Sequence, residues 1–266
     1  MKISNSSNKE NLKKSRWTED DYTLVWNDEF DYEGSPDPSK WTFNVGNHQW
    51  SNQELQAYTN RPENAIVKDG KLYIIARKEK DGEREYTSAR LTTSSKASWT
   101  NGRIAVSAKL PKGKGSWPAI WMLPDDIKNG VSWPLCGEID IMEHVGREEN
   151  QILFCLHSDK HNHVLKTHYM TIAAIADVCE SFHEYSIEWT QTYVEFFVDD
   201  ISYAKYSITD DPDDQSELSW PFNKPFFLIL NIAVGGGFGG AVDEDTLPYI
   251  MEIEYARVYQ KRIKED

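Results

Sequence analysis

Three acidic residues stand close together in the segment GEIDIMEH, residues 137–144. In an extended strand Glu138 and Asp140 share a face, because they are two positions apart. Glu143 is five positions from Glu138, so a regular strand would turn it to the opposite face. One extra residue in the strand, a β-bulge, would return it to the same side. The spacing therefore predicts a bulged strand that presents Glu138, Asp140 and Glu143 together.

Two carboxyl groups on one face can divide the work of a nucleophile and a general acid. With the bulge, the Cα atoms of Glu138 and Glu143 are about four strand steps apart, roughly 13 Å at ~3.3 Å per residue. Side chains that lean together can bring the carboxyl groups near the ~5–5.5 Å that retaining glycosidic-bond hydrolysis uses. Asp140 between them can tune the pKa of one Glu against the other. The alternative is an acidic strand face in solvent, where three like charges repel one another.

Tryptophan residues precede this acidic segment at positions 117, 121 and 133. Indole rings stack on the apolar faces of sugars, and their N–H groups can bind hydroxyls. Trp117, Trp121 and Trp133 are equally compatible with a place in the core, and the sequence leaves that alternative open. The polar block NHQWSNQELQAY at 47–58 adds groups suited to hydroxyl binding. This combination is typical of a groove that binds a carbohydrate polymer.

The elements that must position these residues are short segments rich in β-branched and aromatic side chains. Many alternate apolar and polar residues, which is typical of strands with one face in water. The expected strands are 71–77, 102–110, 138–143, 151–157, 184–190, 193–199, 226–234 and 252–259. Residues 198–201 (VDDI) predict a tight turn, and only 171–178 shows weak helical periodicity. Strands that follow strands without helices predict one all-β domain, an antiparallel sandwich.

Charge and composition exclude several classes of partner. The 29 Lys and Arg against 43 Asp and Glu give a net charge of −14, which speaks against binding a phosphate backbone. No apolar run approaches the ~18 residues of a membrane-spanning helix. We therefore expect no nucleic-acid or membrane partner. The three cysteines, Cys136, Cys155 and Cys179, have no C-x-x-C spacing, so a disulfide framework is not expected.

The first 16 residues are polar and rich in Lys, Asn and Ser. They have no apolar segment of the kind that signal peptides contain. We expect residues 1–16 to form a disordered leader and residues 17–266 to form one catalytic domain. Whether a signal peptide was removed ahead of this chain stays open.

Two other patterns suggest different sites. The segment GGGFGG at 235–240 formally fits a dinucleotide fingerprint, but no βαβ unit surrounds it, so a glycine-rich loop at a cleft edge is the better interpretation. Four histidines between 157 and 168 raise a zinc hypothesis, yet their spacing matches no recognisable zinc pattern. A strand followed by a polar loop explains them better. These histidines are His157, His161, His163 and His168.

In content and order, the segments resemble glycoside hydrolase family 16, specifically its laminarinase-like endo-β-1,3-glucanases. The resemblance covers nearly everything from residue 22 to residue 260. The matching segments are LVWNDEFD (24–31), NQELQAYT (52–59), YTSARLTT (86–93), GRIAVSAKLPKGKGSWPAIWMLP (102–124), WPLCGEIDIMEHVG (133–146), FHEYSIEWT (182–190), LNIAVGG (230–236) and YARVYQ (255–260).

The resemblance implies a jelly-roll β-sandwich of two curved antiparallel sheets, with a substrate cleft on the concave face. It implies that Glu138 is the nucleophile, that Glu143 is the acid/base and that Asp140 holds the charge and geometry of the nucleophile. Catalysis of this kind proceeds with retention and requires no cofactor.

The same resemblance implies binding residues and a metal site. The candidates for the sugar subsites are Asn52, Glu54, Arg90, Trp117, Trp121 and Trp133, with His144 and His157 beside the reacting centre. Family members commonly bind a structural calcium ion on the convex face, and the matching positions are Glu29, Glu254 and the carbonyl of Gly70. Oxygen ligands suit Ca²⁺, although Glu254 stands where the family usually has Asp.

Three functions stay open at this stage. The first is retaining endo-hydrolysis of β-1,3-glucan such as laminarin, with mixed-linkage β-1,3/1,4-glucan as a further substrate. The second is hydrolysis of another polymer, of the agar or carrageenan type. The third is a non-catalytic β-glucan-binding protein, but such relatives typically lose the catalytic carboxylates that this chain retains. We expect a β-glucan partner, a monomer, and an extracellular location, because such polymers are normally met outside the cell.

Overall fold

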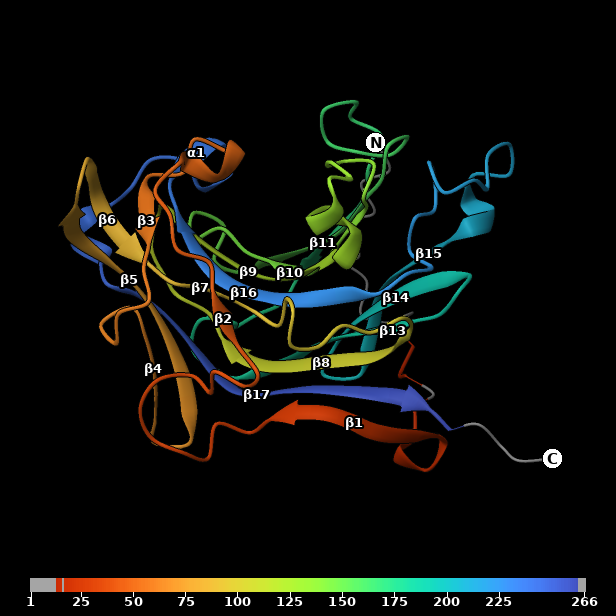
Figure 1. Ribbon diagram of the computed structural model, residues 1–266, viewed down its shortest axis with the longest axis horizontal. Coiled ribbons are helices and arrows are strands. Elements are labelled where there is room, and N and C mark those ends of the chain that lie inside the picture. Colours follow the sequence, from red (N-terminus) through yellow and green to blue (C-terminus); the bar gives the residue numbers. More distant parts are fainter. Residues whose placement is uncertain (1–12, 16, 263–266) are drawn as a thin grey trace.

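Alternating side chains of the strands enclose one hydrophobic core between two stacked β-sheets (Figure 1). The structure is a computed structural model that describes residues 13–15 and 17–262. In strand β10 (Glu138–Glu143), Ile139 and Ile141 are fully buried between the sheets. Strand β16 (Phe226–Val234) is buried along its whole length, which explains its almost uninterrupted apolar sequence.

One sheet carries the acidic segment. Within the described residues it has seven strands in the order β12-β11-β10-β9-β16-β7-β2, and every neighbouring pair is antiparallel. β10 therefore lies near the middle of the sheet, between β9 and β11. Besides β10 and β16, the strands are β2 (Thr42–Phe43), β7 (Arg90–Thr92), β9 (Ser116–Pro124), β11 (Gln151–His157) and β12 (Tyr169–Ala174).

The second sheet covers the other side of the core; in Figure 1, β8, β17 and β1 lie beneath β16. Among the described residues it has ten strands, in the order β15-β14-β13-β8-β17-β5-β6-β3, with β1 also paired to β17 and β4 to β5. Only the pair β3 and β6 is parallel there. The strands are β1 (Tyr22–Asp28), β3 (Gln56–Tyr58), β4 (Ala65–Lys68), β5 (Lys71–Asp81), β6 (Arg84–Ser88), β8 (Gly102–Lys109), β13 (His183–Trp189), β14 (Tyr193–Val198), β15 (Ile201–Ser207) and β17 (Tyr249–Lys261).

Helical segments are short and lie in the connections. The one α-helical turn, α1 (Gly236–Gly239), follows β16 and belongs to the glycine-rich segment. The remaining helical turns in the described part of the chain are 3₁₀ segments at Glu19–Asp21, Gln49–Ser51, Asp125–Asn129, Ile208–Asp210 and Glu244–Thr246. The expected all-β class is confirmed.

The strand boundaries agree closely with the sequence pattern. β10, β11 and β16 match their expected ranges to the residue. Asp199 and Asp200 have φ of 50° and 61° and join β14 to β15, which is the type I′ hairpin geometry. The weak helical periodicity of residues 171–178 does not produce a helix. Residues 169–174 pair with β11 along their whole length, because tertiary pairing outweighs a weak local preference.

Part of the expected leader contacts the second sheet. Lys14 forms an antiparallel bridge with Ile201, and the amide of Ser15 donates to the carbonyl of Asp200 at 2.6 Å. Disorder is therefore wrong for residues 13–15, while residues 1–12 and 16 lie outside the described residues. The three cysteines are unpaired, as expected. A search of the described residues finds no helix with the length and apolarity needed to cross a membrane.

Candidate active site

A β-bulge in β10 brings the three acidic residues to one face. Asp140 pairs with Cys155 and Glu143 with Leu153, so β10 takes three steps where β11 takes two. The two residues between Asp140 and Glu143 are both buried in the core. Because of this extra inward residue, Glu143 returns to the side that Glu138 occupies. The bulge predicted from the spacing is confirmed.

The acids lie in the middle of a cleft on the outer face of the seven-stranded sheet. Two parts of the cleft have volumes of about 420 Å³ and 370 Å³. Glu138 and Asn52 line both parts, and the floor between them is lined by Glu138, Asp140 and Glu143 together. A polymer that follows such a cleft passes over the acids with sugar units on both sides.

Glu143 is held by an indole and stays protonated to a higher pH than an ordinary Glu. Nε1 of Trp117 donates to Oε1 of Glu143 at 2.9 Å. Burial raises the pKa of Glu143, and this effect outweighs the Trp117 hydrogen bond, which lowers it. A carboxyl group with a raised pKa can still carry its proton near neutral pH, as a general acid must.

Glu138 is half-buried and lies beside the buried Asp140. Burial raises the pKa of both groups well above the usual range, and the negative charge of Asp140 raises that of Glu138 further. A hydrogen bond between the two carboxyl groups raises the pKa of Glu138 and lowers that of Asp140. One carboxyl group of the Glu138–Asp140 pair therefore keeps a proton at a pH where an isolated carboxyl group would have lost it. This proton stabilises the negative charge of its partner in the pair.

His157 on β11 lies beside this pair, where the sequence placed it. It is the Cα partner of Glu138 across the strands. Its Nε2 lies 3.3 Å from Oδ2 of Asp140, but the geometry is not that of a hydrogen bond, and Oδ2 has no hydrogen-bond partner among the described residues. A positive charge on His157 lowers the pKa of Glu138, so this imidazole favours the ionised nucleophile.

A guanidinium group between two indole rings forms one part of the cleft lining. Arg90 lies 4.6 Å from the ring centroid of Trp50 and 4.7 Å from that of Trp121, within the range of cation–π attraction. Nε1 of Trp121 donates to Oδ1 of Asn231 at 2.7 Å, which fixes the indole plane. Trp117, Trp121 and Trp133 are all half-buried and line the cleft. Trp121 and Trp133 also pack against a small buried cluster beneath them.

Glu54 is a buried floor residue that orients its neighbours. It accepts hydrogen bonds from Nε2 of Gln56 at 2.6 Å, from the hydroxyl of Tyr58 at 3.3 Å and from Nδ2 of Asn52 at 3.3 Å. Burial raises the pKa of Glu54. Asn52, held in this way, is exposed in the cleft, so the structure brings both predicted residues to the site.

Comparison with known proteins agrees with this geometry. Residues 40–257 match the family model described as Glycosyl hydrolases family 16. The chain belongs to glycoside hydrolase family 16. A β-glucanase of Rhodothermus marinus is 49% identical over 246 residues, which are 90% of this chain and 85% of the relative. A glucan endo-1,3-β-glucosidase of Cryptopygus antarcticus is 40% identical, covering 82% of this chain and 83% of the relative.

The fold is shared with a solved family 16 structure. The laminarinase from Rhodothermus marinus superposes with a TM-score of 0.88 at 48% identity, and the match covers 91% of this chain and 98% of that chain. The expected jelly-roll sandwich is thereby confirmed. The protein is a glycoside hydrolase.

His144 of this family 16 enzyme does not line the cleft. It follows Glu143 directly, so its side chain points to the other side of the strand. The side chain is fully buried, with Nε2 3.2 Å from the carbonyl oxygen of Glu149. Burial lowers the pKa of His144 to about 4, so it is neutral at physiological pH. Its expected place beside the reacting centre is wrong, because the bulge that returns Glu143 to the cleft turns the next residue away.

The three residues expected to bind calcium have other partners or lack a shared site. Glu29 accepts hydrogen bonds from Nε and Nη2 of Arg257 at 2.8 and 2.7 Å, and this pairing lowers the pKa of Glu29. Glu254 accepts a hydrogen bond from Oγ of Ser107 at 2.7 Å. A cation at Glu29 would have to displace the guanidinium group. With the guanidinium group in place, Glu29 does not fit a calcium site in this structure.

The structure adds cleft residues that the sequence candidates do not include. They are Trp50, His163, His168, Asn231 and Phe238. Asn231 has a visible signal, because it is the one polar residue within the apolar strand β16. Phe238 lies in the glycine-rich segment, whose expected place at the cleft edge is confirmed. The two histidines lie in the connection between β11 and β12, where no periodic pattern shows which way a side chain points.

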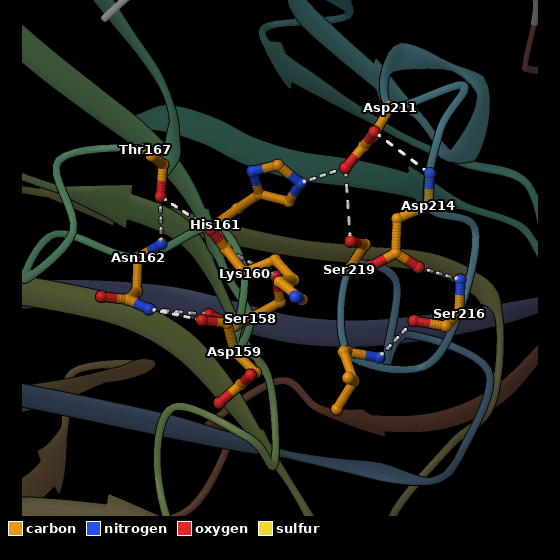
Figure 2. A network of polar contacts seen from close by, with 11 residues as sticks. Ser158, Asp159, Lys160, His161, Asn162, Thr167, Asp211, Asp214, Ser216 and Ser219 are labelled. Carbon is orange, nitrogen blue, oxygen red and sulfur yellow. Dashed lines mark hydrogen bonds and ion pairs between the residues drawn. The ribbon is translucent and has the colours of Figure 1, made fainter.

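The connection between β11 and β12 forms a cleft wall and is held by a polar network (Figure 2). Nε2 of His161 lies 3.0 Å from Oδ2 of Asp211, which belongs to a distant connection. Within the wall, Nδ2 of Asn162 donates to two backbone carbonyls of the preceding turn. The neighbouring residues His163 and Val164 line the cleft. The network therefore ties this wall to the connection that carries Asp211.

Proposed function

We propose that this enzyme hydrolyses β-1,3-glucosidic bonds inside laminarin-type glucans, with retention of the anomeric configuration and without a cofactor. The observation that carries the proposal is the group Glu138, Asp140 and Glu143 at the middle of an open, indole-lined cleft. An open cleft accepts the interior of a chain, as endo-acting hydrolysis requires. The names of the two curated relatives reported above, a β-glucanase and a glucan endo-1,3-β-glucosidase, support glucan as the substrate class.

The geometry supports a double displacement. Glu138 attacks the anomeric carbon while Glu143 gives its proton to the glycosidic oxygen, so the C–O bond to the leaving sugar breaks as the glycosyl-enzyme bond forms. Glu143, now ionised, then takes a proton from water, and the resulting attack on the anomeric carbon releases Glu138. Asp140 lies beside Glu138 and holds its geometry, and a positive charge on His157 favours the ionised form of Glu138 that the attack requires.

Mixed-linkage β-1,3/1,4-glucan is the second substrate that we propose. Trp50 and Phe238 line the two parts of the cleft on either side of Glu138, where aromatic rings can stack on sugar units away from the reacting centre. A purely binding protein is disfavoured by the acids themselves. Three carboxyl groups with raised pKa values cost folding stability, and binding alone would not require them.

Reducing-sugar release from laminarin, barley mixed-linkage glucan and agarose tests the proposal. The wild type should act on the first two substrates, and Glu138→Gln should abolish turnover while keeping oligosaccharide affinity, measured by calorimetry. Glu195→Gln is the matched control, since Glu195 pairs with Lys205 on the other sheet and should keep full activity. Activity on agarose alone, or undiminished turnover by Glu138→Gln, would contradict the assignment.

The enzyme's location and assembly are further proposals. We propose that it works outside the cell as a monomer. The polymer substrate supports the location, and the completeness of the cleft within one chain supports the monomer. Light scattering after size-exclusion chromatography should give the mass of one chain, about 30.7 kDa. Fractionation of the producing cells should place the activity in the medium or envelope, and activity confined to the cytoplasm would refute the location.

A further inference from the structure

A carboxylate, a thiol and an imidazole converge in the cleft floor behind the nucleophile. Asp140 on β10 is the direct Cα partner of Cys155 on β11, and His157 lies two residues further along the same face of β11. One ligand atom from each side chain lies within 4.8 Å of both others. Within residues 13–15 and 17–262 this is the only group of three Asp, Glu, His or Cys side chains that converges in this way.

Two of these groups have polar atoms without partners. Asp140 is 2% exposed, yet its Oδ2 has no hydrogen-bond partner in the described part of the chain, and neither has Nδ1 of His157. Oδ2 of Asp140 and Nε2 of His157 are 3.3 Å apart. Two ligand atoms that bind one tetrahedral zinc ion at about 2.0–2.1 Å are themselves about 3.3 Å apart. The carboxylate and imidazole therefore already have the spacing of two zinc ligands.

The thiol needs only a small movement to complete the set. Its sulfur lies no more than 4.8 Å from the other two ligand atoms, and coordination requires about 3.6 Å. A side-chain adjustment of about 1 Å supplies this difference. Cys155 and His157 also line the cleft together with Glu138 and Glu143, so a fourth coordination position opens toward solvent. Three protein ligands with one open position are a common zinc arrangement.

The charge of the floor favours a cation. Glu138, Asp140 and Glu143 line the floor together and have no Lys or Arg ion-pair partner among the described residues. When a divalent ion binds, the Cys155 S–H bond breaks, the metal–sulfur bond forms, and the proton leaves to solvent. With one carboxylate and one thiolate as ligands, the charge of a divalent ion is balanced.

We propose that Asp140, Cys155 and His157 form a binding site for a borderline-soft divalent metal ion such as Zn²⁺ or Co²⁺, and that the bound ion inhibits the enzyme. The mixed oxygen, nitrogen and sulfur donors select this class over Mg²⁺ and Ca²⁺, which take oxygen ligands. A bound ion fixes Asp140 and holds positive charge beside Glu138, so the nucleophile loses its hydrogen-bond partner and its freedom to attack. The inhibition rests on the proposed function, whereas metal binding does not.

Cobalt binding to the full chain in metal-free buffer tests the site directly. A tetrahedral cobalt–thiolate centre has visible bands and a near-ultraviolet thiolate-to-cobalt charge-transfer band. We expect these bands in the wild type and in Cys179→Ser, because the Cys179 sulfur faces the carbonyls of Pro111 and Glu149 away from the cleft. We expect them to vanish in Cys155→Ser, and Zn²⁺ should displace cobalt from the wild type. Cys155→Ala repeats the measurement if the serine variant does not fold.

Inhibition is measured as the ratio of laminarin hydrolysis with Zn²⁺ to hydrolysis with a chelator, separately for each variant. Loss of an outer-shell partner of a metal lowers affinity roughly 10- to 100-fold. Cys155→Ser removes a direct ligand, so the Zn²⁺ concentration for half-inhibition should rise by at least this factor. The metal site would be overturned if the charge-transfer band were missing in the wild type or persisted in Cys155→Ser. Equal inhibition of the wild type and Cys155→Ser by Zn²⁺ would also overturn it. Cobalt bands in an enzyme inactive on every glucan would refute the proposed function and leave the metal site standing.

Discussion

The cleft floor and the opposite sheet treat carboxylates in opposite ways. In the floor, Glu138, Asp140 and Glu143 have no Lys or Arg ion-pair partner among the described residues, and burial raises the pKa of each. On the ten-stranded sheet, Glu29 is paired with Arg257 at 2.7 Å and its pKa is lowered. The protein pairs carboxylates that stabilise the fold and leaves unpaired those that must exchange protons, which is the usual electrostatic difference between structural and catalytic groups.

Removing one carboxylate from each region should give the largest difference between the two. Glu143→Gln should lower kcat/KM on laminarin by about 10²- to 10⁴-fold, because the general acid is lost. The loss of kcat/KM in this variant should be much smaller on an aryl β-glucoside, because its leaving group needs no protonation. The matched variant Glu29→Gln should keep kcat/KM within about 2-fold, since a partly exposed ion pair contributes modestly to stability and takes no part in proton transfer. Similar losses in both variants would show that the two regions do not differ in this way.

A second test removes a cation from the paired region. Arg103 is 1% exposed and donates to Glu184 at 2.6 Å and to Asp200 at 2.7 Å. Arg103→Met should lower the free energy of unfolding by about 1–3 kcal/mol, less than for a fully buried pair because water can reach both acids. This corresponds to a fall in Tm of about 2–4 °C per kcal/mol. Thermal denaturation measures the loss, and an equal fall in kcat per folded molecule would contradict a purely structural role.

A third test uses the pH dependence of stability. The folded-state pKa of Glu138 lies above its unfolded value, so this group costs stability as the pH rises past the unfolded pKa, and costs nothing below it. Glu138→Gln cannot ionise. In metal-free buffer its Tm should therefore exceed that of the wild type at about pH 8, with a smaller difference at about pH 4. Scanning calorimetry at both pH values measures the difference in Tm between the variant and the wild type. A difference in Tm that does not depend on pH would contradict the electrostatic explanation.

The smallest expected effect concerns the cleft wall. His161→Leu removes the contact with Asp211 that braces the wall (Figure 2). Loss of one hydrogen bond of about 1 kcal/mol should raise KM for laminarin by roughly 5-fold at most and leave kcat unchanged. Steady-state kinetics separates the two constants. A change confined to kcat would mean that the network acts on the acids and not on the wall.

Local rules predicted the all-β class, several of the strands and the shared face of the three acids, whereas the jelly-roll sandwich and the roles of the acids came from the family resemblance. The alternation in 138–143 predicts which side chains of β10 face the core, and the five-residue interval between Glu138 and Glu143 predicts the bulge. Both depend only on the geometry of one strand. The same alternation, applied one residue further, turns His144 away from the side of Glu143, so its burial follows from the local pattern once Glu143 is placed. The local rules do not predict that residues 169–174 would be held as a strand by β11.

The sequence by itself determined the strand pattern, the identity of the three acids and the family, because these follow from neighbouring residues and from segments in a recognisable order. Only the tertiary structure decided which groups meet across long intervals. It paired Glu29 with Arg257, 228 positions away. It also set Arg90 between two indoles and Cys155 beside Asp140. The physical reason is that side-chain periodicity depends on the local backbone, whereas the partner of a charge or a thiol depends on which strands the whole sheet brings together.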